Sequence, residues 1–416
     1  MNALARAERL FAELAEISAD PPGVTRASFG PIETAAHTMI RREAEVIGLP
    51  HHTDAVGNLY VTLPGKDRAA PAVMTGSHLD SVPHGGNFDG AAGVLAGLVM
   101  LELLAEGPQL RCDVTLMVIR AEEMIWFPTH YLGSRAAFGL LPPQTPDQVR
   151  RSDTGRTLAD HMLEAGFEPQ VIRDGKAQLD LTKIKAFVEV HIEQGPVLIE
   201  ANLPVGIVTG IRGNIRHRFA RITGETTHAG GVPRRSRRDA VLAGVELLAS
   251  LEDWWQAAEV DGEDMVLTIG EFSTDPLQHG ITKVPGLVAF TLDVRSQDEA
   301  LLSHFAEFLH SQASDIAARR LVDIDLGTST QAAASPMSPD IQHGLIAAAH
   351  ACGVAHIEIP SGGGHDCATF ASLGVPSGMI FIRNSHGSHN PEEAMDFDDF
   401  ARATDVLTQW VLMVSN

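Results

Sequence analysis

Four short apolar runs, each followed at once by histidine or acidic residues, constrain the fold of this chain more than any other feature. The runs span residues 72–76, 114–119, 186–190 and 378–382. Their length and their richness in aliphatic residues are typical of buried strands in a mostly parallel sheet. Ligands bind outside the carboxyl ends of the strands in such sheets, so we expect the polar residues that follow to meet at one edge.

The residue types at these strand ends indicate a metal site. The segments after the runs, with a glycine-rich loop at 85–90, contribute His78, Asp80, Asp89, Glu122, Glu123, His191 and His389. Imidazole and carboxylate groups without thiolates suit Zn²⁺, Mn²⁺, Co²⁺ or Ni²⁺. Three histidines and two carboxylates exceed what one catalytic ion needs, and they fit two ions bridged by one carboxylate. An adjacent carboxylate would remain as a general base for water.

Each of these residues has a plainer interpretation when it is taken singly. A histidine after a strand is more often solvated than metal-bound, Asp89 is suited to cap a helix, and Glu122-Glu123 is suited to a solvated turn. Their joint occurrence at four strand ends is what favours the metal site.

The order of the expected elements divides the chain into two domains. Residues 212–327 have the pattern β-α-β-β-α-β, which is typical of a smaller α+β unit. Residues 1–211 and 328–416 alternate helical and strand patterns, with helices expected over 3–18 and 34–47. We therefore predict an α/β metal-binding domain with a mostly parallel sheet, interrupted by an inserted α+β domain.

Charge and hydropathy exclude several classes of partner. The 53 acidic and 31 basic side chains give a net charge of −22, which argues against nucleic acid and against an anionic membrane surface. No apolar run approaches the roughly 18 residues that cross a bilayer, and the N-terminus lacks the apolar core of a secretory signal. Three cysteines without framework spacing fit a reducing compartment, so we expect a cytoplasmic protein.

Seven motifs in this order resemble a known family. They are HLDSVPHGGNFDGAAGV, the Glu-Glu pair, HIEQGPVL, TGETTHAG, DVRS, SGGGHD and HGSHNPEE. The chain resembles the hydantoinase/carbamoylase group of amidohydrolases within the M20 metallopeptidase superfamily. That group includes N-carbamoyl-L-amino acid hydrolases, β-ureidopropionases, allantoate amidohydrolases and ureidoglycolate hydrolases. The resemblance extends from about residue 30 to the C-terminus.

The resemblance implies a role for each matching residue of a site with two metals. His78 and His191 would bind one divalent ion, Glu123 and His389 the other, and Asp89 would bridge them. Glu122 would be the general acid/base, and Asp80 would orient His78. The smaller domain would serve as lid and dimerisation surface of a homodimer, and His228, often supplied by the other subunit in this family, would polarise the scissile carbonyl.

The resemblance also implies substrate contacts. Gln194 and Arg295 match substrate-binding positions, and Arg295 is suited to clamp the carboxylate of a small-molecule substrate. Apart from the resemblance, the glycine run of Gly362, Gly363 and Gly364 would offer backbone N–H groups to an anion, although a plain loop is an equal interpretation.

Three segments depart from the family pattern. Residues 124–127 replace the usual continuation after the Glu pair and change the pocket wall beside the base. Lys283 stands where an asparagine contacts substrate in relatives, which changes the charge there. Thr227 replaces an asparagine, and the sequence then continues GGVPRRSRRDA.

Eight arginines lie between residues 212 and 238. Solvated strand edges and ion pairs between subunits are one interpretation of this cluster. Attraction of a carboxylate substrate through Arg216 or Arg234 is another.

The expected function is hydrolysis of N-carbamoyl-type amino acids to amino acid, CO₂ and ammonia. One alternative is an N-acyl amino acid deacylase or dipeptidase with the same chemistry. A non-catalytic metal-binding or ligand-binding relative is a second alternative, which the retention of Glu122 and all five expected ligands disfavours.

Overall fold

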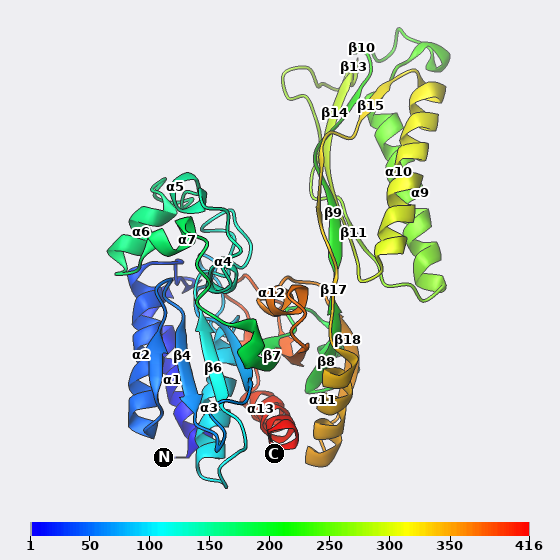
Figure 1. The fold of residues 1–416 in the computed structure, drawn as a ribbon. Helices are drawn as coiled ribbons and strands as arrows, with labels where there is room; N and C mark the ends of the chain where they lie inside the picture. The colour runs from blue at the N-terminus through cyan, green and yellow to red at the C-terminus, as the bar shows by residue number, and fades with distance from the viewer. Residues whose placement is uncertain (1, 416) are drawn as a thin grey trace. The chain divides into compact units, whose positions relative to one another are not determined.

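The computed structural model describes residues 2–415 and divides into two compact units (Figure 1). Unit 1 combines the chain up to Gly210 with the chain from Pro336 onward, and unit 2 is Ile211–Ser335. The second boundary therefore lies at residue 335 and not at the predicted 327. The reason is that β16 (Ser329–Ala332) pairs with β9 (Gly213–Thr223) and so belongs to the sheet of unit 2.

The nine-stranded sheet of unit 1 is mixed, with a parallel centre. Its order is β17-β8-β19-β7-β5-β6-β4-β3, and β18 pairs with β8. The four adjacent strands β19, β7, β5 and β6 pair in parallel, while β8 and β4 flank them antiparallel. The bounds are β3 (His51–Thr53), β4 (Leu59–Leu63), β5 (Ala72–His78), β6 (Val114–Ile119), β7 (Ile184–Ile192), β8 (Val205–Ile211), β17 (Ser335–Pro336), β18 (His356–Ser361) and β19 (Ser377–Ile382).

The four central strands are the four apolar runs of the sequence. Nearly all their residues are buried, as expected for parallel strands covered on both faces. The predicted α/β fold is confirmed, but the sheet, which we predicted to be mostly parallel, is mixed because antiparallel strands flank its parallel centre on both sides.

Helices and short strands complete unit 1. Helix α3 (Ala91–Ala105) contacts β5, β6 and β7, and 13 of its 15 residues are buried, which explains its run of small residues followed by leucines. One apolar cluster joins α3 to α1, α2, α11 and α13. The other bounds are α1 (Ala3–Ile17), β1 (Ala19–Asp20), β2 (Gly23–Val24), α2 (Pro31–Ile47), α4 (Leu132–Ala137), α5 (Thr145–Gln148), α6 (Leu158–Glu164), α7 (Pro169–Arg173), η1 (Leu181–Lys183), α8 (Val197–Ala201), α11 (Pro339–Cys352), α12 (Cys367–Ser372), β20 (Asn384–Ser385), β21 (Ala394–Met395) and α13 (Phe397–Val414).

Unit 2 is an antiparallel sheet with two long helices on one face (Figure 1). The sheet order is β11-β14-β9-β15; β12 pairs with β14, and β16 with β9. Strands β9, β11, β14 and β15 and helices α9 and α10 follow the predicted β-α-β-β-α-β order, and the short strands β10, β12, β13 and β16 are additions to it. The bounds not yet given are β10 (Thr227–His228), η2 (Arg234–Ser236), α9 (Ala240–Val260), β11 (Val266–Thr268), β12 (Phe272–Thr274), β13 (Lys283–Val284), β14 (Leu287–Ser296), α10 (Glu299–Arg320) and β15 (Asp323–Asp325).

Among residues 2–415, no helix is long and apolar enough to cross a bilayer.

Candidate metal centre

The expected metal ligands of unit 1 come together at the carboxyl ends of its central strands. His78 ends β5, His191 lies near the end of β7, and Glu123 follows β6. Asp89 lies in the loop before α3, and His389 in the loop after β20. Their ligand atoms form two groups that share Asp89: His78, Asp89 and His191, and Asp89, Glu123 and His389. All the ligand atoms within each group lie within 4.8 Å of one another.

The two oxygens of Asp89 face different groups. Oδ1 lies 3.1 Å from Nε2 of His191 and 3.5 Å from Nε2 of His78. Oδ2 lies 3.3 Å from Nε2 of His389. His389 in turn lies 3.7 Å from Oε1 of Glu123. A carboxylate that presents one oxygen to each of two ligand groups has the geometry of a bridge between two cations.

The electrostatics of this cluster favour bound cations. Oε1 of Glu123 is buried and accepts no hydrogen bond from the described residues. Burial and the nearby Asp89 carboxylate raise the pKa of Glu123 to about 8. Burial raises the pKa of Glu122 well above its usual range, and the neighbouring carboxylates add to that rise. A divalent cation between these residues would supply Glu123 with a partner and offset the crowded negative charge.

Asp80 fixes the positions of three residues of the cluster. Its Oδ1 accepts the backbone N–H of Glu122 at 3.1 Å and lies 3.3 Å from Nδ1 of His78. Its Oδ2 accepts the backbone N–H of Glu123 at 3.1 Å and the hydroxyl of Ser28 at 2.6 Å. Asp80 is fully buried. Because Asp80 holds Nδ1 of His78, the other ring nitrogen, Nε2, faces the cluster, and Asp80 acts as a positioning carboxylate.

Glu122 projects from a strained turn that a buried ion pair holds in place. The preceding residue, Ala121, has a φ of 54°, which is costly for a residue with a Cβ. The N–H of Ala121 donates to Oε1 of Glu33 at 2.9 Å, and Glu33 is paired with Arg120 at 2.8 Å. Glu122 lies with Oε2 3.9 Å from Nε2 of His78, so its carboxylate is beside the first ligand group.

Gln194 contacts the metal cluster directly. Its side-chain amide donates to Oδ2 of Asp89 at 2.8 Å, and its backbone is held at a φ of 63°. Gly363 lies against this amide, because a Cβ at that position would be 2.9 Å from Oε1 of Gln194. Gly364 is packed more tightly, since its Cβ would lie 2.0 Å from the hydroxyl of Tyr131. The loop at 363–364 thus approaches the cluster through Gln194.

Two residues that sequence reasoning missed complete the bridge. Ser388 donates a hydrogen bond of 2.6 Å to Asp89 or to Glu393. Glu393 accepts the backbone N–H groups of Phe88 at 2.8 Å and of Asp89 at 3.2 Å. Both belong to the HGSHNPEE motif, but their sequence separation from Asp89 gave no signal that they contact it.

Residues 124–127 divide between surface and core. Ile125 is exposed, while Trp126 and Phe127 are buried in an apolar cluster with Phe29. The indole N–H of Trp126 donates to the carbonyl of Ser81 at 2.7 Å. This departure from the family pattern therefore packs behind the turn that carries the two glutamates.

The remaining expected site residues lie in unit 2. His228 in β10 pairs with Lys283 in β13 in the strand register. Nδ1 of His228 accepts the backbone N–H groups of Gly230 at 3.1 Å and Gly231 at 3.0 Å. These bonds require a lone pair on Nδ1, so a neutral ring carries its proton on Nε2. That tautomer is suited to donate a hydrogen bond to a carbonyl oxygen.

Arg216 and Arg295 share one carboxylate. Asp293 accepts Nε of Arg216 at 3.0 Å and Nη2 of Arg295 at 2.8 Å. Burial raises the pKa of Asp293, but the hydrogen bonds and charges of the two arginines outweigh it and lower that pKa. The formal charges of these three side chains sum to one positive charge.

A sheet whose carboxyl ends gather two imidazole–carboxylate groups is typical of metal-dependent hydrolases. Comparison with known proteins agrees with this class. Residues 74–413 match the model of Peptidase family M20/M25/M40. The chain is 36% identical over 405 residues to an N-carbamoyl-L-amino acid amidohydrolase of Geobacillus stearothermophilus, covering 96% of each chain. It is 33% identical over 402 residues to an allantoate amidohydrolase of Escherichia coli, covering 95% of this chain and 94% of the relative.

A solved structure also resembles this chain over nearly its whole length. A hydantoinase/carbamoylase family amidase from Burkholderia ambifaria superposes with a TM-score of 0.88 at 30% identity, covering 99% of this chain and 96% of that one. The chain belongs to Peptidase family M20/M25/M40. Within that family it is an amidohydrolase of the carbamoylase/allantoate amidohydrolase type, which acts on C–N bonds other than peptide bonds.

Proposed function

We propose that this amidohydrolase cleaves the ureido bond of N-carbamoyl-type amino acids and releases amino acid, CO₂ and ammonia. The observation that carries the proposal is the Asp89 carboxylate, with one oxygen toward each ligand group. The identity to an N-carbamoyl-L-amino acid amidohydrolase supports the choice of substrate class.

The five ligands are suited to hold two divalent cations, with Zn²⁺, Mn²⁺, Co²⁺ and Ni²⁺ as the ions that imidazole and carboxylate prefer. His78 and His191 would hold one ion, Glu123 and His389 the other, and Asp89 both. When bound, such ions lower the pKa of water and polarise the scissile carbonyl.

Glu122 is the general base of the proposed reaction. Its carboxylate lies beside His78 and is not needed as one of the five ligands. It takes a proton from the attacking water and returns it to the leaving nitrogen. Asp80 holds the backbone of Glu122 and so sets the direction of that transfer.

In the proposal, unit 2 supplies part of the substrate contacts, and Gln194 and the loop at 363–364 supply the others from unit 1. His228 donates its Nε2 proton to the carbonyl oxygen, which carries negative charge after attack. Arg295 and Arg216, with their one excess charge, bind the substrate carboxylate, and Lys283 adds a cation across the strand register from His228. We further propose a homodimer in which unit 2 is lid and dimerisation surface.

The experiment measures ammonia and free amine in parallel from protein reconstituted with each of the four ions. The panel holds N-carbamoyl-L- and D-amino acids, 3-ureidopropionate, allantoate and matched N-acetyl amino acids. We expect ammonia together with amine from the N-carbamoyl substrates. Amine without ammonia would overturn the proposal in favour of an N-acyl amino acid deacylase or a dipeptidase.

The general base is tested by Glu122→Gln. We expect kcat to fall about 10²- to 10⁴-fold, the usual contribution of a positioned base, while bound metal stays at the wild-type level. Glu123→Gln is the matched control, because it removes the same charge from a ligand and should reduce metal content. Full hydrolysis by Glu122→Gln would refute the assignment.

A further inference from the structure

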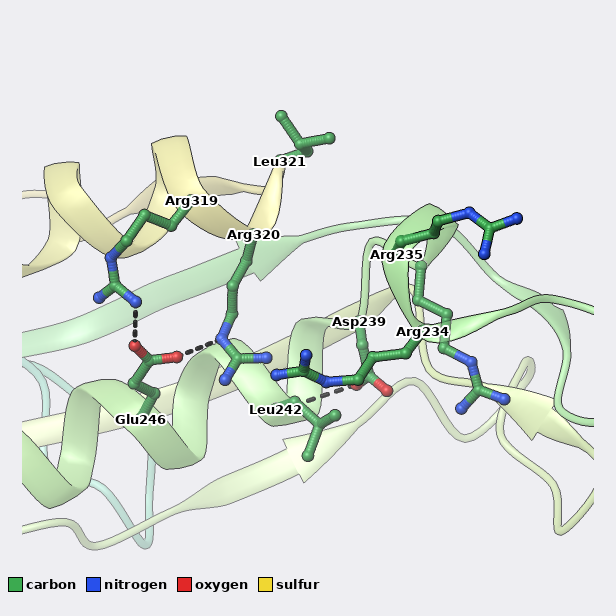
Figure 2. A pocket seen from close by; sticks show the side chains of 9 residues that line it. Arg234, Arg235, Asp239, Leu242, Glu246, Arg319, Arg320 and Leu321 are labelled. Atoms are coloured by element: carbon green, nitrogen blue, oxygen red, sulfur yellow. Dashed lines mark hydrogen bonds and ion pairs between the residues drawn. The ribbon is translucent and has the colours of Figure 1, made fainter.

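A pocket of about 230 Å³ in unit 2 is lined by five arginines, although the chain as a whole is acidic (Figure 2). We call it the arginine pocket, defined by Arg234, Arg235, Arg237, Arg319 and Arg320. It lies where the loop before α9, the first turns of α9 and the end of α10 meet. Two carboxylates also line it, so five guanidinium groups against two acids leave an excess of three positive charges on a chain of net charge −22.

Both carboxylates are already engaged by neighbouring groups. Glu246 binds Arg319 at 2.5 Å and also binds Arg320 (Figure 2). Asp239 caps α9 by accepting the backbone N–H of Leu242 at 3.0 Å. Glu246 therefore neutralises charge on the side of the pocket formed by α10, and Asp239 caps the N-terminus of α9.

The other side of the pocket is formed by cations without a counter-charge. Arg234 and Arg235 are exposed, and neither forms an ion pair with a carboxylate of residues 2–415. Figure 2 shows both on the loop before α9, across from the group formed by Glu246, Arg319 and Arg320. Two unpaired guanidinium groups beside a concave surface can bind a multiply charged oxyanion through several parallel N–H groups.

The pocket shares its backbone with the loop that follows His228. Arg237 donates from Nε to the carbonyl of Val232 at 2.9 Å and from its guanidinium to the carbonyl of Ala229. The 3₁₀ turn of Arg234–Ser236 lies between those contacts and α9. An anion held by Arg234 and Arg235 would therefore restrain the same segment, residues 229–237.

We propose that the arginine pocket binds a phosphate-type oxyanion and that this anion orders the loop at residues 229–237. The ligand is inorganic phosphate or the phosphate group of a small metabolite. A dianion matches the excess charge better than a simple carboxylate does, and its oxygens suit the forked guanidinium groups. Because the site is open to solvent, binding weakens as salt rises.

The test is calorimetric titration of the metal-loaded protein with inorganic phosphate and with glycerol 1-phosphate at low ionic strength. The variant Arg234→Gln/Arg235→Gln removes both unpaired cations. Arg218→Gln/Arg221→Gln is the matched control, since it removes the same charge from exposed positions of unit 2 outside the pocket. Each charge-assisted contact is worth about tenfold in affinity, so we expect the first variant to raise Kd about 10- to 100-fold. The control should change it little.

Hydrogen exchange of the amides at 229–237 supplies a second readout that does not depend on activity. We expect phosphate to slow exchange there in the wild type and in the control, but not in Arg234→Gln/Arg235→Gln. If glycerol 1-phosphate binds more tightly than inorganic phosphate, the ligand of the pocket is a phosphorylated metabolite. If the two bind equally, the pocket recognises the phosphate group alone. Equal Kd for both double variants, binding confined to the metal centre, or no binding by the wild type would overturn the proposal.

Discussion

Replacing Asp80 by asparagine tests how the metal centre is positioned. Each oxygen of Asp80 accepts one backbone N–H, from Glu122 or from Glu123, at 3.1 Å. Either orientation of an asparagine side chain would set its amino group against one of these donors. A buried donor left without an acceptor costs about 1–3 kcal/mol. The Nδ1 atom of His78 also loses its carboxylate neighbour, and changes of this kind lower metal affinity about 10- to 100-fold.

The assay combines chelator competition for bound metal, thermal unfolding and kcat at saturating metal. We expect a folded protein with weaker metal binding and a kcat that stays low when metal saturates, because Glu122 loses its anchor. Ser28→Ala is the control, since it removes one donor to Asp80 and leaves both backbone contacts. An Asp80→Asn protein with wild-type metal affinity and kcat would refute the reasoning.

Three further substitutions probe other parts of the fold. Gly90→Ala adds a Cβ 2.5 Å from the ring of His78 at a φ of 65°; we expect a folded protein with reduced metal content by elemental analysis, and full content would contradict this. Arg120→Met leaves Glu33 buried without its partner, which should cost about 3–5 kcal/mol in urea unfolding, and adding Glu33→Gln should recover part of that loss. Asp293 has a lowered pKa in the folded state, so its contribution to stability is present above its unfolded pKa and is lost as the pH falls through the folded value. Asp293→Asn should therefore lower stability at pH 7 by about 1 kcal/mol or less and flatten the acid side of the stability–pH curve; an unchanged acid limb would contradict the assignment.

The parallel strands and their polar ends could be predicted because each is a local pattern. A strand buried on both faces is a short apolar run, and the residue that follows it faces the ligand edge whatever the rest of the chain does. His78, Glu123 and His191 therefore come together in the structure as their positions predict. His389 belongs to the segment after the fourth run, although it lies in a loop seven residues beyond β19.

The missed features depend on pairing between distant residues. Ser388 and Glu393 contact Asp89 across about 300 residues of sequence, and no periodicity reports such a contact. Glu33 supports the turn at Ala121 from a helix 88 residues earlier. The sequence pattern misplaces strand β16 because all four of its residues are exposed, so no alternation of buried and exposed positions marks its sheet.

The place of β19 in the sheet has a consequence for synthesis of the chain. This strand lies between β7 and β8, yet it is made after all of unit 2. The sheet of unit 1 therefore lacks a central strand while more than a hundred residues are synthesised. Unit 2 is one continuous segment, so all of its strands and helices are available to pack together sooner. We expect unit 2 to gain protease resistance first on the ribosome. His389 follows β19, so the last candidate ligand arrives together with the strand that closes the sheet.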